Sequence, residues 1–236
     1  MKKFAILNGN HLKLIAAFTM LLDHAGLLLF PRVQLFRILG RLAYPIFAFM
    51  IAEGCRYTRN KLRYFLMVFG LGAACQLVYY FFSGDTYLNI LLTFSLSIGL
   101  IYLLQASNQA QTPGKQALWS ILFAAGLLTA YSLDRLLTID YGFWGIMVPV
   151  FAGLFPGRGK TGSFLPVLMM AVGLSILAAD LGGIQHYALL ALPLLLLYSG
   201  RRGKHNMKYF FYIFSLSTWR CCRESQCCLA EVEYEV

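Results

Sequence analysis

Long apolar stretches, separated by short polar or glycine-rich breaks, run along most of the chain. The breaks leave eight apolar segments, at residues 12–30, 38–54, 64–82, 88–105, 116–133, 142–156, 164–180 and 184–199. Their apolar positions are continuous and do not alternate with polar ones, which predicts helices and not strands. Several reach the roughly 20 residues that a helix needs to cross a hydrocarbon core about 30 Å thick. The pattern predicts an all-α, polytopic membrane helix bundle with about eight transmembrane helices.

Three places depart from this regular pattern. The segment 142–156 is short and is expected to be tilted or partly re-entrant. The longest break, "QASNQAQTPGK" at 105–115, is a polar connector with Pro113-Gly114 as a turn signal. A ninth apolar start, "KYFFYIF" at 208–214, stops abruptly. Because no loop is long enough for a separate soluble domain, residues 1–214 are expected to form a single transmembrane domain.

Composition agrees with a membrane protein. Of the 236 residues, 59% are hydrophobic and 13% are charged. A soluble domain of this length has too little interior to bury so many apolar side chains. The first apolar run is too long for the core of a secretory signal and no A-x-A cleavage site follows it, so it is expected to remain as an anchor.

The charges of the loops predict the orientation of the helices. Lysines and arginines collect in the N-terminal segment and in the second, fourth, sixth and eighth loops, whereas the third, fifth and seventh loops carry aspartates. The first loop, with Arg32 and Arg37, is the exception. Since positively charged loops stay in the cytoplasm, the N-terminus is predicted to be cytoplasmic. The net charge of +10 is spread over these loops, which argues against a nucleic-acid partner and favours contact with anionic membrane lipid.

The stretch "LLDHAG" places Asp23 and His24 within the first apolar segment. Ionisable groups are costly in a bilayer and usually face protein or water, where they serve a function. His24 could instead only fix helix packing through a hydrogen bond. Asp23 could orient the imidazole, but neighbours in a helix point about 100° apart, so it could equally pair with Arg41.

The second segment carries further candidates. Gly40 would allow a close helix approach, Arg41 lies near the start of the helix, and Pro45 can kink it. Glu53, near Arg56 and Arg59 at the opposite end, is interpreted first as an interfacial carboxylate paired with those arginines. Other polar residues that flank the helices are expected to be mostly solvated or capping residues: Gln76, Asp85, Tyr87, Asn89, Asp134, Arg135, Asp140, Tyr141, Gln185 and His186.

From these positions we predict that Asp23, His24, Arg41 and Asn89 converge on a polar site. The catalytic candidates are His24, Asp23 and Arg41, and the substrate- or cofactor-binding candidates are Asn89, Glu53, Arg59 and Tyr44. The helices hold no Walker A loop, G-x-S-x-G, H-E-x-x-H or Cys/His metal pattern, and no metal is expected. A histidine can still act alone as the general base of an acyl transfer, with an arginine holding a phosphate or a developing oxyanion. The alternatives are a small-solute or proton-coupled transporter that uses Asp23, His24 and Arg41, and a non-catalytic scaffold.

Several stretches resemble the TraX family. They are "LKLIAAFTMLLDHAGLLLFP" (12–31), "LFRILGRLAYPIFAFMIAEGCRYTRNKLRYF" (35–65), "YLNILLTFSLSIGLIYL" (87–103), "YGFWGIMVPV" (141–150) and "KYFFYIF" (208–214). The family takes its name from a conjugation protein that N-acetylates pilin, and it looks distantly similar to membrane acyltransferases in which a first-helix histidine acts. The resemblance implies an acetyl- or acyltransferase of the bacterial inner membrane, with acetyl-CoA as donor, His24 as base and Arg41 as phosphate or oxyanion partner. A pilin-like peptide, a glycan or a small molecule would be the acceptor.

The C-terminal tail departs from that resemblance. Relatives usually continue past "YIF" with a Tyr-Pro-x-His-like motif and a last apolar helix, whereas this chain reads "SLSTWRCCRESQCCLAEVEYEV" at 215–236. The adjacent pairs Cys221-Cys222 and Cys227-Cys228 lack the C-x2-C spacing of zinc sites. In a neighbouring reading frame, plausible codons for this tail encode approximately Leu-His-Leu-Ala-Val-Leu-Gln-Gly-Ile-Ala-Met-Leu. We therefore predict that residues 215–236 are a frameshifted, unstructured remnant of a lost ninth helix.

Overall fold

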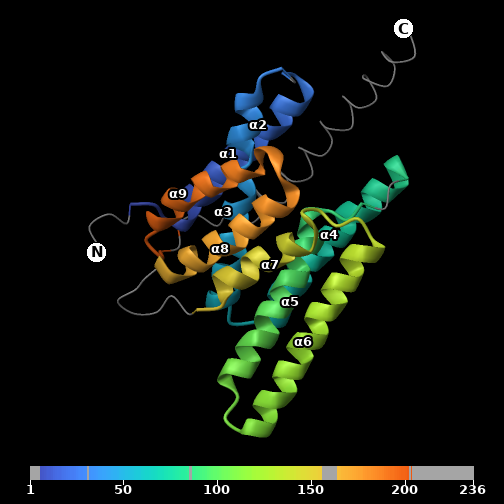
Figure 1. Ribbon diagram of the computed structural model, residues 1–236, viewed down its shortest axis with the longest axis vertical. Coiled ribbons are helices and arrows are strands. Elements are labelled where there is room, and N and C mark those ends of the chain that lie inside the picture. The colour runs from blue at the N-terminus through green and yellow to red at the C-terminus, as the bar shows by residue number, and fades with distance from the viewer. Residues whose placement is uncertain (1–5, 31, 85–86, 156–163, 202, 204–236) are drawn as a thin grey trace. The chain divides into compact units, whose positions relative to one another are not determined.

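The computed structural model describes residues 6–30, 32–84, 87–155, 164–201 and 203. These residues are helical for most of their length, and no strand longer than an isolated bridge occurs among them. They divide into two compact units, one formed by residues 1–47 and 183–236 and the other by residues 48–182. Figure 1 labels the helices of both units. The predicted all-α class is confirmed.

The first unit is built on an antiparallel pair of helices, α1 (Gly9–Leu28) and α2 (Gln34–Gly40). Asn8 begins α1 because its side-chain oxygen accepts the backbone N–H groups of Asn10 and His11. Glycines allow the two helices to approach: a methyl group on Gly26 would lie 2.7 Å from Cβ of Phe36, and one on Gly40 would overlap Asp23. The α1–α2 crossing therefore depends on these two missing side chains.

The same unit joins residues from the two ends of the chain. After the 3₁₀ helix η2 (Gly183–Ala191) and α9 (Leu192–Leu196), the backbone returns to the segment before α1. Leu7 N donates to Leu197 O at 3.1 Å, and Ser199 N donates to Leu7 O at 2.8 Å. These bonds form a parallel bridge between Leu7 and Tyr198 and hold the start of α1 in place.

The predicted second helix is divided in two. Helix α2 ends at Gly40 and α3 (Ala43–Tyr57) follows after a two-residue turn at Arg41 and Leu42. The predicted effect of Pro45 on this helix appears as a two-residue interruption, and Pro45 is the third residue of α3. A proline disfavours helical backbone in the residue before it and has no N–H to give to Arg41 O, so the break falls upstream of it.

The second unit contains α4 (Lys61–Ser83), α5 (Ile90–Gln109), α6 (Pro113–Leu136), α7 (Gly142–Gly153) and α8 (Phe164–Leu181), together with most of α3. Figure 1 shows α5 and α6 side by side as a hairpin, and α7 packs against α5 and α8. Helix α4 ends where Gly84 adopts the left-handed conformation at φ 67°, a common helix stop.

The connector between α5 and α6 is much shorter than predicted. Residues 105–109 continue α5, and Pro113 starts α6 at its first helical position, where its missing N–H costs nothing. Ser107 and Ser120 form a hydrogen bond of 2.8 Å between the two helices. The polar residues of "QASNQAQTPGK" therefore belong largely to helix ends, and the proline begins a helix in place of the predicted turn.

Five helical segments are long and apolar enough to cross a membrane. They are Gln34–Tyr57, which includes α2 and α3, and Lys61–Phe81, Ile90–Gln109, Pro113–Leu136 and Phe164–Leu181. The segments Gly142–Gly153 and Gly183–Leu196 are apolar but shorter, and α1 is not among the five. The chain is thus a helical membrane protein with five candidate spans in the part that the structure describes. The predicted eight crossings and the predicted orientation of the N-terminus stay predictions.

A test of the α1–α2 crossing is the substitution Gly40→Ala. The added methyl group would overlap Asp23 of α1, and overpacking of this kind typically costs about 1–3 kcal/mol. We expect a lower midpoint of thermal unfolding for the detergent-solubilised protein. Gly99→Ala is the matched control, because a methyl group there meets nothing within 4 Å. Equal midpoints for Gly40→Ala and the unsubstituted protein would contradict the close crossing.

Candidate functional site

His24 lies in the last third of α1 and is half-buried, and its ring forms one hydrogen bond. Its Nδ1 lies 2.8 Å from the carbonyl oxygen of Met20, one turn earlier in the same helix. Since a carbonyl oxygen only accepts, Nδ1 is the donor in this bond, and the other ring nitrogen, Nε2, is the one that can carry the lone pair. No hydrogen bond joins Nε2 to another described residue. The free nitrogen is therefore the basic one.

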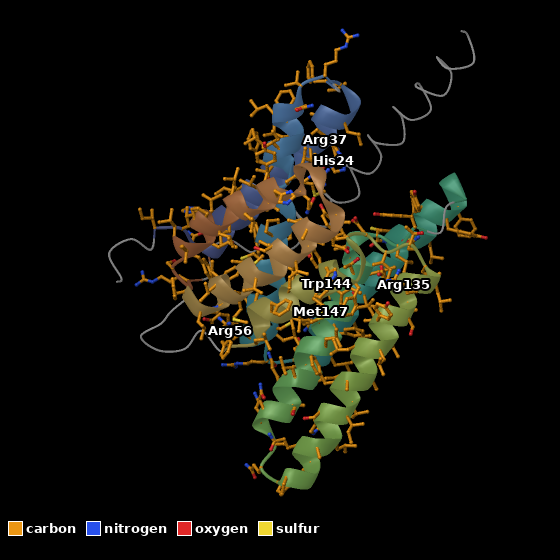
Figure 2. All side chains as sticks on the ribbon, in the orientation of Figure 1. His24, Arg37, Arg56, Arg135, Trp144 and Met147 are labelled. Carbon is orange, nitrogen blue, oxygen red and sulfur yellow. The ribbon has the colours of Figure 1, made fainter. Side chains whose placement is uncertain are left out.

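Asp23 is paired with Arg37, a residue that the sequence did not single out as its partner. Arg37 Nη1 lies 3.5 Å from Asp23 Oδ1, across the α1–α2 crossing. Sequence reasoning left Asp23 between His24 and Arg41, and the structure joins it to neither. Arg37 could have been found, because it lies one helical turn before Arg41 and both can face the same helix. Figure 2 labels His24 and Arg37 on the α1–α2 pair.

Arg41 lies in the turn that follows α2. Its backbone N–H caps that helix, with carbonyl acceptors that include Arg37 O and Ile38 O. Its side-chain Nε is buried and has no hydrogen-bond partner among the described residues. Asp23 Oδ1 is the other such atom at this crossing, because 3.5 Å is too long for a well-formed bond to Arg37. Buried polar atoms without partners are rare in folded proteins, and two of those in the described residues lie at or next to this crossing.

Tyr44 belongs to the same unit as these residues. It lies in the first turn of α3 and is only 4% exposed. Burial of this degree places its aromatic ring in the core of the helices, where it contributes apolar packing area.

Glu53 and Arg59 lie in the other unit, at the end of α3. Glu53 is buried and forms an ion pair with Arg56, which also donates from Nη2 to Phe155 O at 3.0 Å. The interpretation of Glu53 as the partner of a neighbouring arginine agrees with this pair. Arg59 is exposed and takes part in no ion pair among the described residues.

Asn89 is the N-cap of α5, and its amide group is fully used within the protein. Its Oδ1 accepts from Leu91 N at 3.0 Å and Leu92 N at 3.3 Å. Its Nδ2 donates to Gly72 O at 2.8 Å and to Gln76 Oε1 at 3.1 Å, both on α4. Asn89 thus links α4 to the start of α5.

The network around Asn89 extends to the start of α7. The backbones of Leu88 and Ile139 form a parallel bridge, and Tyr87 Oη donates to Asp140 Oδ1 at 3.0 Å. Thr93 Oγ1 donates to Asp140 O at 3.1 Å. Tyr87, Asn89 and Asp140, expected to be mostly solvated or capping residues, are therefore connected to each other. Sequence spacing carries little signal for this network because its members are about 50 residues apart in the chain.

Tyr141, next to Asp140, has a strained backbone. Its φ of 62° is the one positive φ among the described residues other than glycine. This left-handed conformation costs a residue with a Cβ roughly 1–2 kcal/mol, and such outliers persist where the surrounding structure holds them. The bridge and the hydrogen bonds of Asp140 hold the backbone immediately before it.

The predicted site residues thus fall in two groups. Asp23, His24, Arg41 and Tyr44 belong to the first unit, and Glu53, Arg59 and Asn89 to the second. Within the first unit the structure brings Asp23 close to the turn that holds Arg41, since Gly40 touches Asp23. The convergence of Asp23, His24, Arg41 and Asn89 on one polar site stays a prediction.

No group of three or more histidine, cysteine or acidic residues that could hold a metal ion occurs in the described ranges. Cys55 and Cys75 are free thiols. The four tail cysteines and the proposed frameshift at 215–236 lie outside the described residues.

Comparison with known proteins identifies the family. Residues 8–216 match the family described as "TraX protein". The chain belongs to the TraX family. It is 27% identical over 235 residues to a protein of Dichelobacter nodosus described as "Probable fimbrial assembly protein FimC, serogroup H1", with 86% of this chain and 89% of that protein covered.

A shorter match joins this TraX-family chain to "Uncharacterized protein RP591" of Rickettsia prowazekii (strain Madrid E). The two are 37% identical over 60 residues, which cover 25% of this chain and 23% of that protein. No solved structure matches the chain. The predicted resemblance to the TraX family is confirmed.

Asn89→Ala tests the structural role of the α4–α5 link. The substitution removes an N-cap, worth about 0.5–2 kcal/mol, and leaves Gly72 O and Gln76 without their amide partner. We expect a clearly lower midpoint of thermal unfolding. Asn108→Ala, at an exposed position in the last turn of α5, is the matched control and should leave the midpoint nearly unchanged. If both substitutions had the same effect, Asn89 would have no special role in stability.

Tyr87→Phe tests the Tyr87–Asp140 bond through pH. Tyr87 lies between the α4 and α5 spans, and partial burial together with the Asp140 carboxylate raises its pKa above the ordinary 10.0. The folded protein holds this phenolic proton more tightly than the unfolded chain, so the stabilisation is complete below pH 10.0 and is lost as the pH rises. We expect the unfolding midpoint to fall more steeply above that pH in the unsubstituted protein than in Tyr87→Phe. Parallel curves would show that this bond contributes nothing.

Proposed function

We propose that this TraX-family protein is a membrane acetyl- or acyltransferase in which His24 is the general base. The observation that carries the proposal is the bond between His24 Nδ1 and Met20 O, which leaves the basic Nε2 free. An ionisable side chain in an apolar helix costs free energy. Because the reactive nitrogen of His24 is also unused, we expect this side chain to serve a function.

Arg41 is proposed to bind the negatively charged groups of this reaction. Its buried Nε has no partner in the described part of the chain, and Arg41 follows directly on Gly40, which touches Asp23 beside His24. A guanidinium is always charged and can hold a phosphate or stabilise the negative charge that develops on an acyl oxygen. The ion pair of Arg37 uses the Asp23 carboxylate, so Arg41 remains available for an external anion.

The proton has a balanced path through His24. An acceptor amine or hydroxyl attacks the carbonyl carbon of an acetyl thioester, and its proton moves to His24 Nε2 as the new bond forms. The carbon–sulfur bond then breaks, and the imidazolium returns the proton to the departing sulfur. The donor is proposed to be acetyl-CoA, whose phosphates suit Arg41, and no metal is needed.

The nature of the acceptor is proposed from the relatives. The protein of Dichelobacter nodosus is described as a fimbrial assembly protein, and it covers most of this chain. We propose that the acceptor is a pilin-like peptide, with a glycan or small molecule as the other acceptor classes that the same chemistry serves. From the apolar helices and the charges of the loops, we propose that this chain lies in the bacterial inner membrane with eight crossings and a cytoplasmic N-terminus.

The tail is part of the proposal. The family match ends at residue 216, close to where the predicted change of frame begins. We propose that residues 215–236 replace a native last helix, and resequencing of the gene tests this directly. Unbroken codons with no neighbouring frame that encodes an apolar helix would overturn it.

The test of the reaction uses purified protein with acetyl-CoA labelled in the acetyl group, alone and with a membrane fraction. Label should pass to the protein or to a membrane component. His24→Ala should lower the rate about 10²–10⁴-fold, the usual contribution of a general base. His186→Ala is the matched control, because His186 also places Nδ1 against a backbone carbonyl, 3.0 Å from Gly183 O, but is exposed.

Three further outcomes separate the role of Arg41, the role of His24 and the alternative function as a transporter. Arg41→Gln should raise KM for acetyl-CoA about tenfold while the protein still folds, as one lost charge-assisted contact predicts. Transfer that is unchanged by His24→Ala would overturn the mechanism. Proton-coupled solute uptake by proteoliposomes without acetyl transfer would replace it with the transporter.

A further inference from the structure

An open groove lies at the N-terminal end of α4. Its volume is about 490 Å³, and it is lined by Asn60, Leu62, Arg63, Leu66 and Met67. The lining combines one charged and one amide side chain with three apolar ones. The groove belongs to the second unit, whereas His24 and Arg41, which carry the proposed reaction, belong to the first.

The polar end of this groove carries a positive charge with no ion-pair partner among the described residues. Arg63 lines the groove and Arg59 lies four residues before it in the chain; both are exposed, and neither takes part in an ion pair in the part of the chain that the structure describes. The neighbouring cations are engaged: Arg56 pairs with Glu53, and Lys61 lies 5.2 Å above the ring of Tyr102. Arg59 and Arg63, which have no such contacts within the described ranges, favour an anionic partner.

The start of helix α4 adds to the positive electrostatic potential of these arginines. Its first turn carries no acidic residue that would offset the positive end of the helix dipole. Asn60 Oδ1 accepts one backbone N–H, that of Arg63, at 2.9 Å. The helix end therefore reinforces the two arginines and does not neutralise them.

The apolar end of the groove continues along α4. Leu62, Leu66 and Phe69 recur at helical spacing and are 66%, 53% and 44% exposed. Only 6% of the membrane-span window in Lys61–Phe81 is buried inside the protein. An exposed apolar stripe on a candidate span lies against lipid chains, and here it begins directly beside the two arginines.

We propose that this groove binds one anionic phospholipid. Its phosphate lies between Arg59 and Arg63 at the end of α4, and an acyl chain follows Leu62, Leu66 and Phe69. A soluble anion would use the charges but leave the apolar stripe unused, and an apolar membrane peptide would use the stripe but leave two arginines unpaired. A phospholipid with an acidic headgroup matches both ends of the groove.

The test measures lipid retention by the full chain. The protein is purified from membranes or exchanged into mixed phosphatidylcholine and phosphatidylglycerol, and bound lipid is counted by native mass spectrometry. The unsubstituted protein should retain phosphatidylglycerol in preference to phosphatidylcholine. Arg63→Gln should lower that retention about fivefold, the effect of one basic side chain near an anionic surface.

Two variants make the result specific. Arg135→Gln removes an exposed arginine from the far end of α6 and should leave retention unchanged. Leu66→Asn keeps the charge but interrupts the apolar stripe and should also lower retention. Thermal unfolding of each variant in detergent verifies that it is folded.

Three outcomes would overturn the proposal. One is equal retention of phosphatidylglycerol by Arg63→Gln and the unsubstituted protein. Another is an equal loss in Arg63→Gln and Arg135→Gln, which would mean non-specific attraction to charge. The third is that excess inorganic phosphate displaces bound phosphatidylglycerol equally from the unsubstituted protein and from Leu66→Asn. That result would mean a site for soluble anions.

Discussion

Every polar group that this chain carries into its apolar helices has to be satisfied by the chain itself, because hydrocarbon offers no hydrogen bonds. Hydroxyl side chains show the constraint most directly. Thr19 donates to Ile15 O, Ser95 donates to Leu91 O, and Ser97 donates to Ile146 O on α7 at 2.7 Å. Each bond removes an unpaired group and, for Ser97, also joins two helices. The helix boundaries at Asn8, Asn60 and Asn89 follow from the same requirement, since side-chain amides accept the first free N–H groups.

Against that background the exceptions are informative. Four buried side-chain atoms lack a hydrogen bond in the described part of the chain: Asp23 Oδ1, Arg41 Nε, Tyr102 Oη and Gln185 Nε2. Two of the four lie at the α1–α2 crossing, next to a histidine whose basic nitrogen is also unused. Unpaired buried polar atoms, which cost free energy, thus occur at the place where the sequence carries an acid and an imidazole inside an apolar helix. This coincidence is the structural basis of the site proposed around His24 and Arg41.

Much of the fold followed from the residues alone. The eight apolar segments match helices or helical stretches of the described residues. His24 could be singled out because an ionisable side chain in an apolar run is costly wherever the helix packs. Membership of the TraX family was also readable from local motifs such as "LLDHAG", because these are contiguous in the chain.

The features that could be read from the residues are therefore those that depend on neighbours along the chain: the helices, their apolar character and the presence of a histidine among leucines. The partners of the polar side chains depend instead on how the helices pack. Arg37 and not Arg41 faces Asp23, because the helix turns after Gly40 and the missing side chain there lets α1 approach. Tyr87 and Asp140 meet across 53 positions of chain. Such pairings are set by helix packing and loop geometry, and no local pattern of polar and apolar residues encodes them.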